Sequence, residues 1–468
     1  MLLQSCTQGA SIMKEMEKMR THNRLVLIIF GLFFSLFIGV VQGQESTEQD
    51  SQQVKEGLTF GLLPAISYNS DLGVQYGGVV NFFQFGDGST YPKYRHSLYF
   101  EWSRYTRGSG INRVFYDSEY LIPGLRLTAD LAYLPDQALD FYGFNGYEAV
   151  YHPTWEETGH ADYRSRMFYR HQRNTFRSFV DLQGAIRETD FRWIAGLGLM
   201  HNSVASVDLD RLNEGQEGDD MLPDIPGLYD KYVEWGIIPD NEKDGGWSNN
   251  IKLGLIYDTR DFEPNPMDGV WSEIVFFAAP GFLGNGDLGF TRISATHRHY
   301  FTLIKEKLSF VYRISGQGTL FGKTPFFMQP YMITSFNPSV TADGLGGAKN
   351  VRGMVRNRVV GDAVAFGNAE FRWKFYRTVV FRQNIYLALN FFTDGGQVIR
   401  GIDFSKDGVP EEERELYFDP GAEKLHLTAG AGLRIVLNEN FILAIDHGRA
   451  FDSRDGESGT YIGLNYLF

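Results

Sequence analysis

The chain has 468 residues, a formal net charge of −13 at pH 7 and a single cysteine, Cys6. One cysteine excludes a framework of disulfides, and the acidic balance argues against nucleic acid as a partner, because phosphate binding needs concentrated lysine and arginine. Aromatic residues make up 15% of the chain, which also contains 52 glycines. This composition is typical of strands and turns rather than of helices.

The N-terminal region predicts an export signal. Basic residues precede the apolar run 25–41, and the "VQG" that ends at Gly43 supplies the small residues that a signal peptidase reads. We therefore expect residues 1–43 to be a cleaved signal peptide, with an uncleaved anchor as the alternative. The polar stretch after it predicts a linker and periplasmic lead-in over residues 44–71. No second apolar run is long enough for a membrane helix, so a helical membrane bundle is excluded.

Beyond the linker, the strongest signal is an alternation of polar and apolar side chains. In "NAEFRWKF", Glu370 and Arg372 face one way, and Phe371 and Trp373 face the other. A sheet with lipid outside and a hydrated lumen inside needs this pattern, and it must close, because an open edge in hydrocarbon leaves backbone groups unpaired. We therefore predict an all-β fold, a transmembrane antiparallel β-barrel of about 16 strands over residues 72–468.

The alternation divides the chain into strands and two kinds of connection. The predicted strands are 72–86, 94–106, 112–121, 125–133, 160–171, 173–187, 189–201, 250–261, 270–281, 288–304, 306–320, 362–375, 384–398, 425–437, 440–451 and 459–468. Residues 57–68 are not assigned to any of these strands. They form either a periplasmic lead-in or one further strand, in which case the count is one too low. Short turns such as "KE" and "NEN" contrast with the long segments Asn202–Asn249, Phe321–Gly361 and Ile399–Lys424. This asymmetry is typical of periplasmic turns and outer loops. Acidic runs such as "EEERE" then belong to solvated loops, where we expect no metal site.

One long connection carries an unusual motif. Val351, Arg352, Gly353 and Met354 lie between two predicted strands; "GNAEFRWKF" follows on the next strand, and "NFFTDGG" on the one after it. Upstream, "YDTRDFEPNPMDGVW" forms a strand–turn–strand signature that contains Asp258, Arg260, Asp261 and Gly269. This combination resembles the outer-membrane assembly-factor superfamily, which includes BamA-like and TamA-like barrels, the bacterial surface antigens and the two-partner secretion transporters.

The resemblance implies that the motif-bearing loop folds back into the barrel and that Arg352 engages Glu370 and Asp394. The alternation agrees, because a period of two puts both carboxylates on the lumen face. A guanidinium is a rigid fork that suits bidentate contacts with carboxylates. Such a contact could serve only to plug and stiffen the barrel, and it need not be catalytic.

The apolar residues of the motif have an expected role in packing. Val351 and Met354 would seat the tip of the loop, and Gly353 would allow a close approach of its backbone. The superfamily usually has an aromatic residue where Met354 stands, so this position departs from its pattern.

The two ends of the chain add two further expectations. "GLNYLF" at the C-terminus places Tyr466 and Phe468 on one face of an alternating last strand, with Gly463 just before them. This arrangement resembles the assembly signal of bacterial outer-membrane barrels. Members of the superfamily that feed unfolded clients usually carry periplasmic POTRA modules ahead of the barrel. Residues 44–57 are too few for one, so we expect a barrel-only member.

Two functions are compatible with these features. The first is insertion or translocation of polypeptide, or of lipid, in the bacterial outer membrane, through a weak seam between the first and last strands. Gly73, Gly77 and Gly78 would loosen that seam. The expected partners are outer-membrane lipid, client outer-membrane proteins and further assembly subunits. The alternative is a passive or substrate-selective channel, in which Arg164, Arg166 and Arg170 could form a basic stripe, although neighbouring carboxylates favour their neutralisation.

An enzyme is the third possibility, and the sequence argues against it. The candidate pairs are His297 with His299 and Asp446 with His447. His297 and His299 are expected on the lipid face. No nucleophile elbow, zinc-helix motif or phosphate loop is present. We therefore predict no catalytic residues, no metal ligands and no cofactor.

Overall fold

The computed structural model describes residues 54, 56–65, 67–69, 73–91, 93–106, 108–263, 265–336, 343–380, 383–437, 441–464 and 466–468. The predicted signal peptide, half of the predicted linker and the predicted barrel start at Leu72 lie outside these residues. The chain divides into two units, Met1–Gln53 with Val379–Arg382, and Val54–Thr378 with Gln383–Phe468. The second unit contains the sheet.

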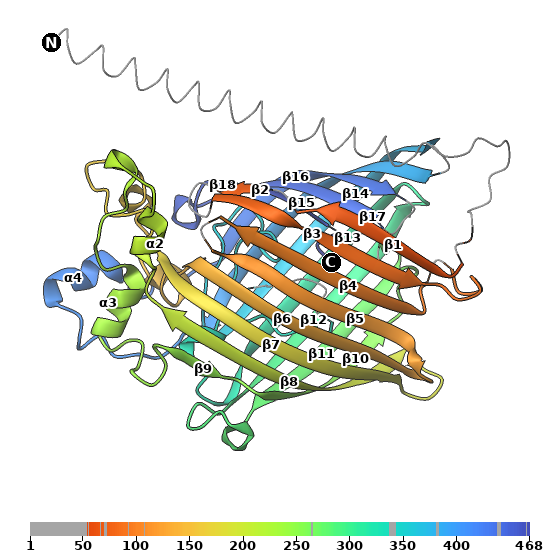
Figure 1. Ribbon diagram of the computed structural model, residues 1–468, viewed down its shortest axis with the longest axis horizontal. Coiled ribbons are helices and arrows are strands. Elements are labelled where there is room, and N and C mark those ends of the chain that lie inside the picture. The colour runs from red at the N-terminus through yellow and green to blue at the C-terminus, as the bar shows by residue number, and fades with distance from the viewer. Residues whose placement is uncertain are drawn as a thin grey trace, which may run out of the picture. The chain divides into compact units, whose positions relative to one another are not determined.

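The second unit consists mainly of strands joined by turns and a few short helices (Figure 1). The strands are β1 Leu58–Pro64, β2 Ser67–Asn69, β3 Gly73–Gln84, β4 His96–Tyr105, β5 Gly110–Ile122, β6 Leu125–Asp140, β7 Arg170–Ala185, β8 Phe191–Ala205, β9 Gly245–Trp247, β10 Asn250–Asp258, β11 Gly269–Ala279, β12 Phe290–Ile304, β13 Leu308–Gly322, β14 Ala363–Val380, β15 Gln383–Arg400, β16 His426–Leu437, β17 Phe441–Ala450 and β18 Ser458–Leu464. The α-helices are α2 Leu209–Asn213, α3 Leu228–Glu234 and α4 Glu411–Tyr417. The 3-10 helices are η1 Gly146–Glu148, η2 Pro153–Trp155, η3 Gly218–Asp220, η4 Gly281–Leu283, η5 Phe326–Met328 and η6 Ser453–Asp455.

The strands form one antiparallel sheet in which neighbours in sequence are neighbours in space. β1 and β2 both pair with β3, so they are two parts of one strand. β9 and β10 likewise both pair with β8. When β1 with β2 and β9 with β10 are each counted as one strand, the 18 strand elements of the described residues form 16 strands. The predicted all-β antiparallel fold is confirmed.

One predicted strand was wrong and one observed strand was missed, so the two errors cancel in the count. Residues 57–68, left over in the prediction, contain β1 and part of β2, so the sheet begins before the predicted start at residue 72. Residues 160–169 form turns rather than a strand, and β7 begins only at Arg170. Met167, Phe168 and Tyr169 are all buried in succession, which a strand with two different faces does not allow.

The two faces of the sheet differ in chemistry. On β14, Phe371 and Trp373 point outward with 48% and 46% of their surface exposed, whereas Glu370 and Arg372 point inward and are buried. On β15, Asp394 is also buried on the inner face. An apolar exterior matches hydrocarbon, and an inward polar face needs water or protein partners. The predicted alternation over these strands is confirmed.

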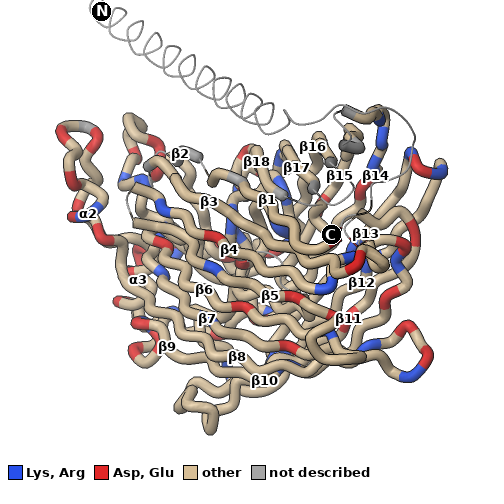
Figure 2. The backbone as a smooth tube through the Cα atoms, turned by 45° about the vertical axis from the view of Figure 1, so that its right-hand side comes forward, with Lys and Arg blue, Asp and Glu red and all other residues tan. Residues whose placement is uncertain are grey.

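The long connections lie at one end of the sheet. They are 141–169, 206–244, 323–362 and 401–425, of which the last three match predicted loops. α2, α3 and α4 gather at this end (Figure 1), and acidic residues are frequent on the loops around α2 and α3 (Figure 2). Buried aromatic side chains join the connections, including Tyr169, Tyr232, Trp235 and Phe418. In the described part of the chain, no helix is long and apolar enough to cross a membrane.

Candidate functional site: an arginine-anchored loop in the lumen

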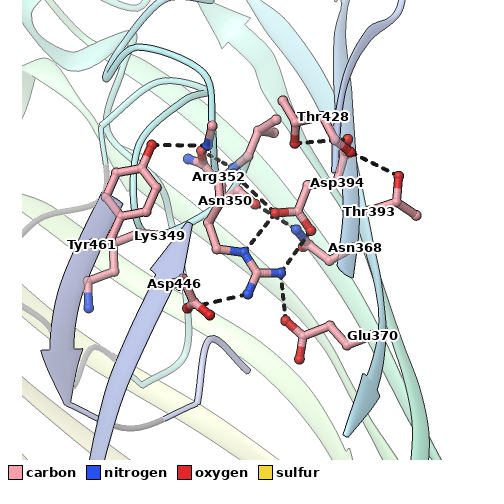
Figure 3. Close-up of polar contacts among 12 residues, drawn as sticks. Lys349, Asn350, Arg352, Asn368, Glu370, Thr393, Asp394, Thr428, Asp446 and Tyr461 are labelled. Carbon is pink, nitrogen blue, oxygen red and sulfur yellow. Dashed lines mark hydrogen bonds and ion pairs between the residues drawn. The ribbon is translucent and has the colours of Figure 1, made fainter. Parts of the chain in front are cut away.

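The connection 323–362, called the lumen loop here, enters the interior of the sheet between β13 and β14. Leu345 and Val359 form an isolated antiparallel bridge that brings its two limbs together. Between these limbs, the loop tip Val351–Met354 lies against the inner faces of β15, β17 and β18 (Figure 3). The tip is buried along its whole length.

Arg352 at the loop tip binds the carboxylates of two neighbouring strands. Its Nε donates to Asp394 Oδ2 at 2.8 Å and its Nη2 to Asp394 Oδ1 at 3.0 Å, while its backbone N–H also donates to Oδ2 at 3.1 Å. Nη2 lies 2.6 Å from Glu370 Oε1 (Figure 3). All three side chains are at most 1% exposed. The guanidinium therefore fixes the loop tip to β14 and β15 at once.

A third carboxylate, Asp446 on β17, completes the surroundings of Arg352. Asp446 Oδ2 lies 3.5 Å from Arg352 Nη1, and both carboxylate oxygens accept from Arg434, at 2.8 and 2.9 Å. The ring of Phe392 lies 3.5 Å from the Arg352 guanidinium carbon, a favourable cation–π contact. Asp446 was not predicted as part of this site, although alternation along β17 places it on the lumen face.

The charges of this network balance. Arg372 Nε donates to the free oxygen of Glu370 at 2.8 Å. The network then consists of three guanidinium groups and three carboxylates, those of Arg352, Arg372, Arg434, Glu370, Asp394 and Asp446. Because buried charges are tolerated only when paired, removal of any one member leaves an uncompensated charge inside the barrel.

Gly353 lets the loop tip come close to the wall. Its φ is +96°, and a Cβ there would lie 2.6 Å from the backbone nitrogen of Arg449 and from the carbonyl carbon of Gly448. Both the conformation and the space therefore favour glycine. The Gly353 N–H donates to the hydroxyl of Tyr461 on β18 at 3.0 Å (Figure 3). The tip is thus tied to the last strand as well as to β14, β15 and β17.

The apolar residues of the tip pack on a small cluster of their own. Val351 and Met354 are buried together with four further apolar side chains, Leu345, Val359, Val364 and Val398. These come from the loop itself and from β14 and β15. Met354 therefore helps to seat the loop tip on β14 and β15.

Beyond the tip, a second buried arginine binds the connections at the loop-rich end. Arg358 donates through Nε to the carbonyl oxygen of Arg454 at 2.8 Å, through Nη1 to that of Gly146 at 3.0 Å and through Nη2 to that of Ala149 at 3.2 Å. Next to this contact, outside the strands, hydrogen bonds from Arg454 lower the pKa of Asp452, which keeps that carboxylate ionised. Arg358 thus joins the lumen loop to the connections 141–169 and 451–457.

The strand–turn–strand signature lies apart from Arg352 and builds the turn between β10 and β11. Arg260 donates to both oxygens of Asp258 at 2.8 Å, and Asp261 accepts backbone N–H groups of the turn. Gly269 has a φ of +100°, and a Cβ there would lie 2.3 Å from the carbonyl oxygen of Thr259. The signature residues therefore have contacts that shape a turn rather than hold the lumen loop.

The C-terminal residues differ from their predicted position. β18 contains Gly463 and ends at Leu464, so Tyr466 and Phe468 are not on a strand. Ile462 points outward on β18, and a continued alternation would turn both aromatic rings outward too. Instead both are buried, with the Arg372 guanidinium 4.4 Å from the ring centre of Tyr466 and 5.0 Å from that of Phe468. Their role as an assembly signal stays a prediction.

The proposed basic stripe is not present. Arg164 and Arg166 lie in the connection 141–169, where Arg164 stacks 3.6 Å from the ring centre of Trp155. Arg170 begins β7, and its Nη1 lies 3.2 Å from Asp140 and 3.1 Å from Glu156. Arg164 is engaged by its cation–π contact, and Arg170 is engaged by its ion pairs. Arg164, Arg166 and Arg170 therefore do not line one face of the sheet.

The histidine pairs are not arranged as catalytic groups. Asp446 faces the lumen, whereas His447 lies on the outer face with its Nδ1 2.8 Å from Thr460 Oγ1. His297 is on the outer face of β12, bonded to Ser272 Oγ at 2.8 Å, and His299 stacks on Phe301. Among the described residues, no group of three or more His, Cys, Asp or Glu side chains is placed to hold a metal ion.

A β-sheet with an apolar outer face and a polar inner face that is filled by a loop is the architecture of an outer-membrane barrel. The chain belongs to the Omp85 superfamily, whose domain matches residues 97–465. Proteins of this superfamily reside in the bacterial outer membrane, and its assembly and transport barrels are not enzymes. No curated protein matches in sequence.

Solved structures of the same fold are similar to this chain. CdiB from Escherichia coli is similar with a TM-score of 0.50 and 12% identity, over 88% of this chain and 63% of that one. BamA from Haemophilus ducreyi, lacking POTRA domains 1-3, is similar with a TM-score of 0.48 and 15% identity, over 88% of this chain and 69% of that one. The chain thus spans less than two thirds of the CdiB chain, and the likeness concerns the fold alone.

Proposed function

We propose that this outer-membrane barrel inserts or passes polypeptide at the outer membrane, with its lumen loop locked by Arg352 on Glu370 and Asp394. The single observation that carries the proposal is the Arg352 guanidinium bonded to carboxylates of two neighbouring strands in an Omp85 domain. The partners would be client outer-membrane or secreted proteins, outer-membrane lipid and further assembly subunits. Export would use residues 1–43 as a cleaved signal peptide.

The lock would act on the last strand and on two strands of the wall before it, since β15 and β14 lie three and four places before β18. Through Arg352 the loop tip holds β14 and β15, and through Gly353 and Tyr461 it holds β18. A buried ion pair that loses one partner costs about 3–5 kcal/mol. The lock would therefore keep the wall from β14 to β18 in one arrangement until a client is engaged.

The strands expected at the seam are short. β18 has 7 residues, and β1 and β2 have 7 and 3, whereas β14 and β15 have 18 each. On the neighbouring β3, a Cβ at Gly77 would lie 2.2 Å from the carbonyl oxygen of Trp102, so this glycine is needed for close packing. Fewer backbone hydrogen bonds mean weaker pairing, which supports a seam that opens sideways.

A disulfide across the seam tests the proposal. In a chain whose Cys6 is replaced, one cysteine in β1 and one in β18 should stop client insertion when oxidised and restore it when reduced, in vesicles supplied with an unfolded barrel protein. The matched control links Ser178 to Leu199, which are register partners on β7 and β8. Undiminished insertion with the seam linked would contradict the proposal.

The second candidate is a passive or substrate-selective channel, which the polar inner face of the sheet favours. Single-channel conductance separates the two functions. A loop-plugged insertase should conduct little as the intact chain and more after deletion of residues 346–362. A large, steady conductance of the intact chain would favour the channel.

A further inference from the structure

A positively charged side chain, that of Arg449, lies on the lipid-facing side of β17. Asp446 is buried on the lumen side, and a Cβ at Gly448 would lie 2.8 Å from the carbonyl oxygen of Arg352 at the loop tip. Alternation therefore turns His447 and Arg449 outward, and both are exposed. Among the described residues, the Arg449 guanidinium has no ion pair and no hydrogen bond, so it is open to a group outside the chain.

Arg449 lies at the height of the membrane where lipid headgroups are found. It is the last residue but one of β17, at the end that leads into an outer connection. An arginine at such a strand end costs little in the bilayer, in contrast to one at the middle. Closer to the middle, Leu433, Ile445 and Ile462 are register partners across β16, β17 and β18 on the same outward face. Acyl chains cover an apolar row of this kind, so the row and Arg449 together match a lipid with an anionic headgroup.

The carboxylates near Arg449 do not supply its countercharge. Asp452 Oδ2 lies 3.2 Å from Lys424 Nζ and 2.8 Å from Arg454 Nη2, so two other cations share it. Glu457 is exposed in the same connection and forms no ion pair with any of the described residues. A phosphate group would provide the missing charge, and the planar guanidinium suits two phosphate oxygens at once.

His447 provides a second polar group on the same face, closer to the middle of the membrane. Its Nδ1 lies 2.8 Å from Thr460 Oγ1 on β18, and its Nε2 has no hydrogen-bond partner in the described part of the chain. His447 and Arg449 are about 7 Å apart along the strand. In a lipid, the carbonyl groups of the acyl linkages lie deeper than the phosphate, in the same order as His447 and Arg449.

The inner face of the same strand segment carries the loop tip. A Cβ at Gly353 would lie 2.6 Å from the backbone nitrogen of Arg449. The Gly353 N–H donates to the hydroxyl of Tyr461, which is the register partner of Asp446 on β18. The hairpin of β17 and β18 therefore lies between the loop tip inside the barrel and any lipid that binds Arg449 outside.

We propose that the outer face of β17 binds a lipid of the outer leaflet by its phosphorylated headgroup. The Arg449 guanidinium pairs with the phosphate, His447 Nε2 donates to a carbonyl oxygen of an acyl linkage, and the acyl chains lie on Leu433, Ile445 and Ile462. The bound lipid holds the hairpin of β17 and β18 against the loop tip. Only this effect on the hairpin next to the seam rests on the proposed function.

The test measures binding of phosphorylated lipid A, and of the same lipid with its phosphates removed, to the full chain in detergent micelles by native mass spectrometry. The wild-type chain should bind the phosphorylated form at least about tenfold more tightly. Arg449→Gln should bind both forms alike, because it lacks the group that pairs with the phosphate. Arg449→Lys should keep part of the preference, since it retains the charge but not the planar fork.

Arg104→Gln is the matched control. Arg104 also faces outward, on β4 beside the ring of Trp102, but its Nη2 donates to Asn112 Oδ1 at 2.6 Å. Because this guanidinium already has a partner within the chain, the variant should keep the wild-type preference. Excess inorganic phosphate should not displace the lipid, since it lacks the acyl chains.

Three results would overturn the proposal. The first is equal binding of both lipids by the wild-type chain, which needs no variant to fold. The second is an equal loss of preference in Arg104→Gln and Arg449→Gln, which would show a general attraction of charge. The third is displacement of the lipid by inorganic phosphate.

The effect on the seam is measured separately. Phosphorylated lipid A should slow formation of the disulfide between β1 and β18 in a chain that has Arg449, and not in Arg449→Gln. Phosphate-dependent binding together with failed client insertion would leave the lipid site standing and contradict the proposed function. Client insertion without any preference for the phosphorylated lipid would do the reverse.

Discussion

Two arginines of the lumen loop are both completely buried, yet they are held in different ways. Arg352 is surrounded by carboxylates from β14, β15 and β17. Among the described residues, Arg358 donates its hydrogen bonds to backbone carbonyl oxygens, those of Arg454, Gly146 and Ala149. Arg352 therefore binds the loop to the barrel wall by charge, and Arg358 binds it to other connections by neutral acceptors.

The difference lies in what remains when each arginine is lost. Carbonyl groups at the loop-rich end can take water in place of Arg358, because surface connections are accessible after a small movement. The carboxylates around Arg352 lie deep in the lumen and belong to a balanced network, so their charges stay uncompensated. The wall anchor should therefore be the costlier one to break, and four substitutions rank the two anchors.

The largest effect is expected for Arg352→Ala. It leaves Glu370 and Asp394 buried without their shared cation, which should lower the free energy of unfolding by about 3–5 kcal/mol. Chemical unfolding in detergent micelles measures this change, with the heat-dependent shift of the folded barrel on gels as the readout. Arg356→Ala is the control, because that arginine of the same loop is 45% exposed and its ion pairs are worth about 0–1 kcal/mol.

A double variant sharpens this first prediction. Arg352→Ala combined with Asp394→Asn removes one cation and one carboxylate, so Arg372 stays paired with Glu370 and Arg434 with Asp446. The double variant should recover part of the lost stability, but not the lock. Equal instability of the single and double variants would show that packing, not charge, is the cause.

Gly353→Ala is expected to have the second largest effect. A φ of +96° is strained for alanine, and its Cβ would overlap the backbone of Arg449 and Gly448, so the cost should be about 2–4 kcal/mol. Gly463→Ala is the matched control, because a Cβ there meets nothing within 4 Å. Thermal unfolding compares the two. Similar losses from both variants would mean that the tip does not need its close approach to β17.

The anchor of Arg352 on the barrel wall could be predicted in part, because an alternation with a period of two shows which side chains share one face of a sheet. Alternation placed Glu370 and Asp394 on the lumen side, and the resemblance to the superfamily implied their contact with Arg352. The same alternation along β17 places Asp446 on the lumen face. Its neighbour His447 then lies on the opposite face, because adjacent residues of a strand point to opposite faces, so the two could not form the pair considered from the sequence.

The remaining errors arise where contacts distant in sequence decide the structure. Residues 160–169 alternate charge with aromatic residues as a strand does, yet Arg164 stacks on Trp155 and the segment turns. Tyr466 and Phe468 continue the pattern of β18, but Arg372 and Arg313 draw Phe468 inward. A cation–π contact of this kind leaves no periodic signal. The same holds for Arg358, whose carbonyl partners carry no side-chain signature.

Arg358→Met should have a smaller effect than either change at the tip. Three carbonyl oxygens lose their donor, which should cost about 1–3 kcal/mol, less where water enters. The change should appear as faster proteolysis within the connections 141–169 and 451–457, measured by mass spectrometry, while the loop tip stays protected. Proteolysis at the tip instead would contradict the separation of the two anchors.

Tyr461→Phe should have the smallest effect on stability and a larger one on opening of the seam. It removes one hydroxyl that accepts from the Gly353 N–H at 3.0 Å, a loss worth about 0.5–1.5 kcal/mol. The same hydroxyl donates to the carbonyl oxygen of Met354 at 3.4 Å, so its loss removes both bonds from the loop tip to Tyr461 and should free the last strand while Arg352 still holds β14 and β15. Tyr99→Phe, which removes a hydroxyl bond to Glu101 of 2.7 Å on β4, is the control. Disulfide formation across the seam should accelerate only in Tyr461→Phe, and equal rates in both variants would show that the wall anchor alone holds the strands near the seam.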